Sequence, residues 1–251
     1  MKFILAEKRE MTQKFADNGA VVPVTRLIAG PCLVTQVKTA KTDGYTALQL
    51  GFGSKKKLSK PMAGHLKKLG NFRYTKEFRI AEDKNDFKAG DKISVKIFAV
   101  GDTVQVTGVS KGRGFQGVVK RHGFHGSPAT HGHKDQNRMP GSIAAGGPQH
   151  VFKGTRMAGR MGGDQVTVKN LKVVEVNPAA NEIFIRGAVP GPISNLILIS
   201  GEGDLITAVE EIKPVTEAVE AETKEIPEPA AEAETAEKIE DKAEAKEEEK
   251  K

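Results

Sequence analysis

The stretch TVQVTGVSKGRGFQGVVKRHGF, residues 103–124, contains the change of pattern that decides the fold. Val104 and Val106 alternate with polar residues, which is typical of a half-buried strand. From residue 110 the alternation stops. Residues 110–124 then contain glycines at GxGxxG spacing (Gly112, Gly114 and Gly117) and four basic residues, but no acid. We therefore expect a strand that runs directly into a segment of a different kind.

Short strands are predicted on both sides of this segment. The alternation is clearest at Ile93, Val95 and Ile97, which would share one face. The predicted strands are residues 22–28, 33–37, 46–52, 93–98, 104–106, 166–174, 183–186 and 196–199. A short helical turn is predicted at 60–70, and a turn at 177–181. Several short strands with few helices indicate a mainly β fold, either a small barrel or a sandwich.

The interruption, residues 110–163, has an unusual composition. Glycine supplies 13 of its 54 residues, and nine Lys or Arg face a single acid, Asp135. A segment this long without regular structure is rare inside a compact domain and is usually functional or disordered. Glycine allows close backbone approach, and each basic side chain can meet a phosphate. We interpret these residues, hereafter the arm, as a segment threaded through folded RNA, which is recognised by shape and phosphates.

Other chemistries fit the arm less well. A dinucleotide site needs a helix after the third glycine, and Gly123, Gly126 and Pro128 would break it. The motifs that a kinase needs are absent from the sequence. The arm holds five of the six histidines (His122, His125, His131, His133 and His150), but no cysteine accompanies them as a zinc ligand. No catalytic constellation stands out, so the sequence predicts neither an enzyme nor a metal site.

The charge divides the chain into regions. Residues 209–251 contain 16 acids and 7 bases, which leaves 32 bases and 16 acids in residues 1–208. Such a basic region indicates an anionic partner, with nucleic acid ahead of a membrane surface. No apolar run approaches the roughly 20 residues of a membrane-spanning helix. The predicted organisation is one β domain in two parts (1–109 and 164–208), the arm (110–163), and a disordered acidic tail (209–251), for which a single solvated helix is the alternative.

Cys32 is the only cysteine, so an internal disulfide is impossible. Its apolar neighbours predict a buried thiol in or beside a strand. The absence of a disulfide framework fits a cytoplasmic protein.

Several segments match a known family in the same order: GVSKGRGFQGVVKRHGF, ATHGH, RMPGSI, VFKGTRMAGRMGG and VTVKNLKVVEVN. Over about residues 8–200 the chain resembles the bacterial form of universal large-subunit ribosomal protein three, the L-three family. The resemblance implies a small closed β-barrel of the translation-protein type. It also implies a long loop that reaches into large-subunit rRNA towards the peptidyl transferase centre. Such a protein binds rRNA early in subunit assembly and contacts neighbouring ribosomal proteins in the cytoplasm, without a cofactor, metal, membrane or small-molecule substrate.

The resemblance also assigns residues to roles. The arm positions expected to bind RNA, with two histidines added as polar contacts, are Lys111, Arg113, Lys120, Arg121, His122, His131, Arg138, Lys153, Arg156 and Arg160. The tip expected near the peptidyl transferase centre comprises Gly141, Ser142, Ala145, Gly146, Gly147, Pro148 and Gln149. Two positions depart from the family: Glu10 replaces a glycine, and Gln149 is not at the offset of the glutamine that some members modify.

Two alternatives stay open from the sequence. The first is a non-ribosomal RNA-binding protein or RNA chaperone with the same arm chemistry. The second is a nucleotide-dependent enzyme that uses residues 112–117.

Overall fold

A computed structural model describes residues 1–16, 18–66, 69–80, 87–203 and 205 of the protein. The predicted acidic tail, 209–251, lies outside these residues. Strands dominate the described part and helices are few and short, so the prediction of a mainly β fold is confirmed. Within the same ranges, no helix is long and apolar enough to cross a membrane.

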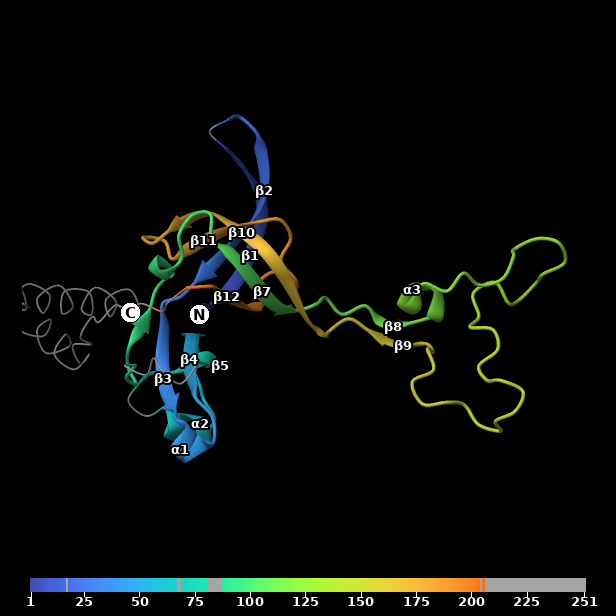
Figure 1. Cartoon of the computed structure of the whole chain (residues 1–251), viewed down its shortest axis with the longest axis horizontal. Coiled ribbons are helices and arrows are strands. Elements are labelled where there is room, and N and C mark those ends of the chain that lie inside the picture. Colours follow the sequence, from blue (N-terminus) through green and yellow to red (C-terminus); the bar gives the residue numbers. More distant parts are fainter. Residues whose placement is uncertain (17, 67–68, 81–86, 204, 206–251) are drawn as a thin grey trace, which may run out of the picture. The chain divides into compact units, whose positions relative to one another are not determined.

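Six strands pair in a closed ring, and every neighbouring pair is antiparallel (Figure 1). In ring order they are β1 (Lys2–Phe15), β12 (Leu196–Gly201), β7 (Thr103–Val109), β10 (Gln165–Asn177), β11 (Glu182–Arg186) and β2 (Val21–Ala29). The alternation in β7 has the predicted effect, because Val104 and Val106 are buried while Thr103 is exposed. The period-two pattern therefore points one face of the strand into the core.

A second sheet has four strands in the order β5 (Phe72–Arg79), β4 (Ala47–Ser54), β3 (Cys32–Lys38) and β6 (Lys92–Ile93). Two short helices accompany it, α1 (Ala40–Asp43) and the predicted helical turn, α2 (Lys60–His65). Phe3 of β1 stacks on Phe78 of β5, with 4.3 Å between the ring centroids. Buried residues of the ring and of this sheet belong to one hydrophobic cluster. The two sheets thus share a core.

β1 shows what the sequence pattern missed. No strand was predicted before residue 22, yet β1 is the longest described strand. Phe3, Ile4, Leu5 and Ala6 are all fully buried. Alternation fails here because one face of β1 packs inside the ring and the other packs against the second sheet, so both faces need apolar side chains.

The strand predicted at 93–98 is wrong. β6 ends at Ile93, and Val95–Ile97 form one turn of 3-10 helix, η1. Both Val95 and Ile97 are buried nevertheless. The chain must turn here from β6, at the edge of the four-stranded sheet, into β7 of the ring. Two buried residues at period two do not distinguish such a turn from a strand.

The arm is less irregular than predicted. Beyond the ring it contains β8 (Gly114–Gln116), α3 (Val118–His122) and β9 (Gly159–Met161), and β8 pairs with β9. Because β7 and β10 are already paired, the β8–β9 pair continues the same hairpin outward (Figure 1). α3 ends at Gly123, which takes the left-handed conformation with φ of 71°. The expectation that Gly123 stops any helix after the glycine motif is therefore confirmed.

Cys32 begins β3 and is fully buried, as predicted. Its thiol lies 3.5 Å from the carbonyl oxygen of Leu5. Burial raises the pKa of this thiol to about 12. A thiol with such a pKa is a structural side chain rather than a reactive one.

The ring should fold without most of the arm. Ser110 N–H donates to Asp164 O (2.9 Å) and Gly163 N–H donates to Ser110 O (3.3 Å). These hydrogen bonds join the two ends of the arm without any residue of 111–162. Within 111–162, Val118 is the only buried hydrophobic residue. Replacing 111–162 with a short Gly/Ser linker should therefore shift the midpoint of thermal unfolding by less than about 5 °C.

Circular dichroism with calorimetry measures that shift and its cooperativity. For comparison, Ile199→Ala removes a buried side chain of β12 and should lower the free energy of unfolding by about 2–5 kcal/mol in both the full and the shortened chain. A shortened chain that unfolds without a cooperative transition would show that the arm supports the core.

Candidate nucleic-acid interface

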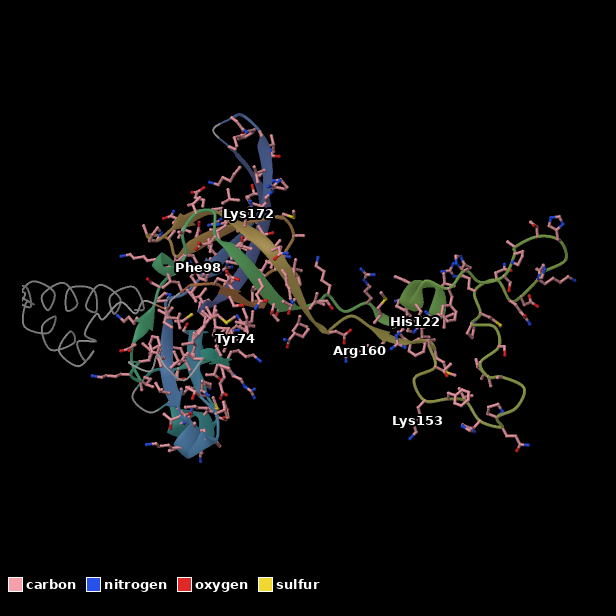
Figure 2. The ribbon with its side chains drawn as sticks, viewed as in Figure 1. Tyr74, Phe98, His122, Lys153, Arg160 and Lys172 are labelled. Atoms are coloured by element: carbon pink, nitrogen blue, oxygen red, sulfur yellow. The ribbon has the colours of Figure 1, made fainter. Side chains whose placement is uncertain are left out.

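The arm presents its basic side chains to solvent (Figure 2). In Figure 2, His122 lies at the end of α3, Arg160 lies on β9, and Lys153 lies on the loop beyond them. Residues 128–147 are exposed throughout. Six ion pairs occur among the described residues, and all of them lie outside the arm. None of the nine arm cations therefore has a carboxylate of the described chain to neutralise it.

A cleft of about 640 Å³ lies where the arm leaves the ring. Five cationic side chains and one histidine line this arm-base cleft, together with a single acid, Asp164. The basic residues and the histidine are Lys8, Lys111, Arg113, Arg121, His122 and Arg160. Five of these six were predicted as RNA-binding residues. The structure therefore gathers half of the predicted basic set into one concave, positively charged site.

Lys8 comes from β1, more than a hundred residues from the rest of the cleft, and sequence reasoning missed it. Its ammonium donates to the carbonyl oxygens of Val189 (2.6 Å) and Gly191 (3.0 Å). Burial lowers the pKa of Lys8, and the nearby charge of Lys111 lowers it further. No local pattern marks Lys8, because only the closure of the ring brings it to the arm.

Close backbone approach shapes the cleft. Gly162 has a φ of 76°, and a Cβ at this position would lie 2.2 Å from the carbonyl oxygen of Lys111. That separation is far below van der Waals contact, so only glycine lets the outgoing and returning chains of the arm meet here. The glycines of the arm thus include at least one that its own fold requires.

Two residues of α3 that line the cleft also contact the returning chain of the arm. Arg121 donates from its Nη1 to the carbonyl oxygen of Met157 (2.7 Å), and His122 Nε2 lies 3.0 Å from the same oxygen. The guanidinium of Arg156 lies over the ring of Phe124, 4.9 Å from its centroid. These contacts give the base of the outer loop a defined geometry.

The remaining predicted residues are spread along the arm outside the cleft. Those expected to bind RNA are Lys120, His131, Arg138, Lys153 and Arg156, and all are exposed. At the tip, all the predicted residues are exposed except Pro148, which is half-buried. Ser142 Oγ donates to the carbonyl oxygen of Ala144 (2.9 Å). A Cβ added to Gly146 or Gly147 would meet no heavy atom within 4 Å, so the protein's own packing does not require glycine there.

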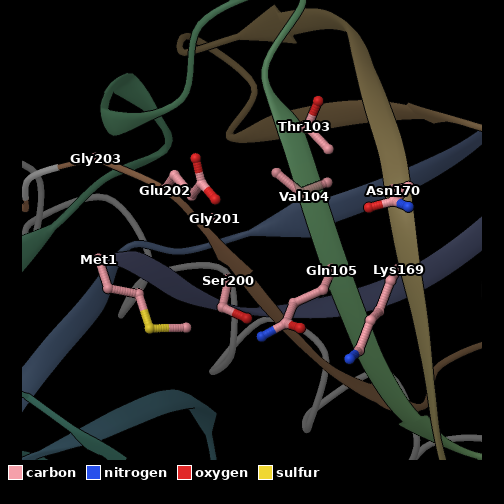
Figure 3. Close-up of a pocket in the computed structure, with 10 residues that line it drawn as sticks. All are labelled: Met1, Thr103, Val104, Gln105, Lys169, Asn170, Ser200, Gly201, Glu202 and Gly203. Atoms are coloured by element: carbon pink, nitrogen blue, oxygen red, sulfur yellow. The ribbon is translucent and has the colours of Figure 1, made fainter.

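A second cavity, of about 730 Å³, lies at the other end of β7 (Figure 3). Its walls come from Met1, from β7, β10 and β12, and from the residues that follow β12. The two charged side chains that line it, Lys169 and Glu202, have opposite signs. The side chains of this cavity therefore carry no excess of positive charge.

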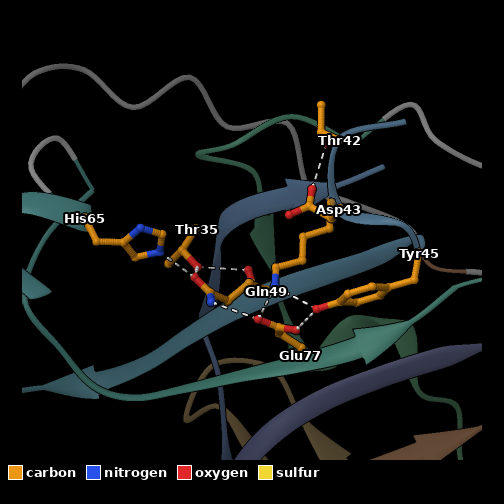
Figure 4. Close-up of polar contacts among 8 residues, drawn as sticks. Thr35, Thr42, Asp43, Tyr45, Gln49, His65 and Glu77 are labelled. Atoms are coloured by element: carbon orange, nitrogen blue, oxygen red, sulfur yellow. Dashed lines mark hydrogen bonds and ion pairs between the residues drawn. The ribbon is translucent and has the colours of Figure 1, made fainter. Parts of the chain in front are cut away.

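A polar cluster around Glu77 on the four-stranded sheet shows the contrasting arrangement (Figure 4). The Lys38 ammonium lies 2.7 Å from the Tyr45 hydroxyl and 2.9 Å from a Glu77 carboxylate oxygen. Tyr45 and Gln49 also donate to Glu77, as Figure 4 shows. The hydrogen bond from Lys38 lowers the pKa of Glu77. This cluster satisfies its own charges, which leaves little to attract an external ion.

The geometry does not favour the enzyme alternatives. α3 has five residues, too few for the helix that receives a pyrophosphate in a dinucleotide fold. In the described part of the chain, no three His, Cys, Asp or Glu side chains gather closely enough to hold a metal ion. His122 contacts backbone, and His150 packs edge-on against Phe152 with 5.4 Å between ring centroids.

The comparisons with known proteins all match a single family. The family model for "Ribosomal protein L3" matches residues 68–188. A large ribosomal subunit protein uL3 from Herpetosiphon aurantiacus is 50% identical over 201 residues, which cover 78% of this chain and 94% of the relative. The uL3 proteins of Pelotomaculum thermopropionicum (50% over 202 residues) and Bacillus cytotoxicus (46% over 204 residues) cover 79% and 80% of this chain, and 95% and 96% of their own lengths. The chain therefore belongs to the ribosomal protein L3 family.

Proposed function

We propose that this protein is a structural constituent of the large ribosomal subunit that binds the subunit's rRNA mainly through its arm. The observation that carries the proposal is the set of nine arm cations without a carboxylate partner among the described residues. A folded protein keeps such a set where an external polyanion neutralises it. Membership of the ribosomal protein L3 family supports rRNA as that polyanion.

The aromatic side chains of the arm add a second kind of contact. Phe115 is 77% exposed and Phe152 is 53% exposed. Aromatic rings that are open to solvent beside cations can stack on unpaired bases, which is a common mode of RNA recognition. The arm thus combines phosphate neutralisation with base stacking.

In the same proposal, the six-stranded ring corresponds to a barrel of the translation-protein type and neighbours other ribosomal proteins. The arm extends towards the peptidyl transferase centre, with residues 141–149 at its tip. The protein acts in the cytoplasm, early in subunit assembly, as a structural component. Its contribution is to hold rRNA segments in place.

The tip provides a direct test. Gly147 is outside the left-handed region and has open space around it, so Gly147→Val should change the free energy of unfolding by less than about 0.5 kcal/mol. If the tip lies against rRNA near the peptidyl transferase centre, the same change should slow growth and alter sensitivity to antibiotics that act there. Thermal unfolding of the purified protein and growth of cells that depend on the variant measure the two effects.

Gly162→Val is the matched control, because its Cβ would collide with the Lys111 carbonyl oxygen and should destabilise the arm itself. Normal growth and normal antibiotic response with Gly147→Val would contradict the placement of the tip.

Assembly should depend on the arm. Cells whose only copy has residues 111–162 replaced by a short linker should accumulate immature large subunits, because the shortened protein lacks the cations that hold rRNA. Sucrose-gradient profiles at matched expression of the full and shortened proteins measure this. Mature subunits at normal levels would exclude an essential role for the arm in assembly.

A further inference from the structure

We infer that the arm-base cleft is a binding site for one phosphate group, and that Lys8 of β1 is one of its ligand-binding residues. The inference rests on the proposed function for the source of the phosphate, the rRNA backbone. It adds a defined site, a ligand class and a residue that lies outside the arm.

The charge balance of the cleft supports this assignment. Five cations face one acid, and no described carboxylate lies within 4.0 Å of any of the five. Concave walls of one sign concentrate the electric field and attract counter-ions. An anion placed among these side chains would remove repulsion that the protein itself leaves uncompensated.

The hydrogen-bond donors of the cleft support it independently. No described acceptor binds the side chains of Arg113 and Arg160, so both guanidinium groups keep their donors available. A guanidinium donates two parallel hydrogen bonds to phosphate oxygens, which makes Arg well suited to this ligand. Lys8 uses two of its three N–H donors on the carbonyl oxygens of Val189 and Gly191, and the third remains for the ligand.

The origin of these side chains gives the site a mechanical role. Lys8 belongs to the ring, Arg113 to the outgoing chain, Arg121 to α3 and Arg160 to β9. A phosphate bound by all four would join the ring to both chains of the arm. Binding would therefore fix the direction in which the arm leaves the ring, in addition to attaching RNA.

The size of the cleft is compatible with such a ligand. Its volume of about 640 Å³ falls within the usual range of small-molecule sites. It can hold a phosphate with its attached sugars. The other two polar candidates are less suitable, because the Lys38–Glu77 cluster is internally paired and the cavity of Figure 3 has charges of both signs.

Titration of the full chain with inorganic phosphate tests the site. Ionic strength is kept constant with chloride, and NMR follows the amides of Lys111 and Gly162. We expect saturable shifts at these amides, and a dissociation constant that rises about tenfold or more in Arg113→Gln and in Arg160→Gln, since each loses charge-assisted hydrogen bonds. Both side chains are exposed, so neither change should impair folding.

Two further variants complete the design. Lys153→Gln removes an exposed arm cation outside the cleft and should leave phosphate binding unchanged. Lys8→Met should weaken phosphate binding, whereas Lys8→Arg, which keeps the charge, should retain most of it. Shifts that do not saturate, or an equal loss in Lys153→Gln, would overturn the inference.

The same variants with a large-subunit rRNA fragment distinguish the sources of phosphate. If the cleft holds an RNA backbone phosphate, Arg113→Gln/Arg160→Gln should weaken RNA binding several-fold more than the charge-matched Arg138→Gln/Lys153→Gln, which removes two exposed arm cations outside the cleft. If it holds a free phosphate ion, Arg113→Gln/Arg160→Gln should lose phosphate binding and weaken RNA binding no more than that control. Failure of the phosphate titration leaves the rRNA-binding role of the arm intact, because that role is tested separately by removing the whole arm.

Discussion

The antiparallel pairing of β7 with β10 is the contact on which the rest of the structure depends. It closes one side of the ring, where Val106 lies opposite Val168 and Thr107 opposite Thr167. It also brings together the two ends of the arm, through the hydrogen bonds of Ser110 with Gly163 and Asp164. This strand pair therefore contributes buried apolar side chains to the ring. The arm, which has more than fifty residues, extends from the end of the same pair.

All six described ion pairs lie on the ring and the four-stranded sheet. There some cations, such as Lys2, Lys14 and Lys38, pair with carboxylates, whereas others, such as Lys55, Lys76 and Lys172, do not pair with any described carboxylate. On the arm, no such pairing occurs among described residues. The Lys14–Glu175 pair is exposed and contributes little to stability, whereas the Lys2–Asp102 and Lys38–Glu77 pairs are partly buried. Unpaired cations in one segment repel one another and hold counter-ions, and their release into solution drives association with RNA.

Much of this could be predicted from the sequence because the signals are local. Alternation identified β7, β10, β11 and β12, and composition identified the arm. The features that the sequence did not predict depend on contacts between residues far apart in the chain. β1 has consecutive apolar residues because two sheets cover it, and Lys8 reaches the cleft only through ring closure. The segment 93–98 turns because the chain must pass between sheets. β5 could have been found from Phe72, Tyr74 and Phe78, whose alternation is partly hidden by the charged residues of an edge strand.

We propose that the arm, rather than the ring, carries the rRNA site. The most direct test is the salt dependence of binding to a large-subunit rRNA fragment, for the full chain and for the chain with residues 111–162 replaced by a short linker. Each lost phosphate contact should reduce the slope of log affinity against log salt by about 0.7–0.9. Because the arm holds nine cations, we predict a sharp fall in affinity and a slope reduced by several units. A folded, shortened protein that keeps both its affinity and its slope would place the RNA site on the ring and contradict this account.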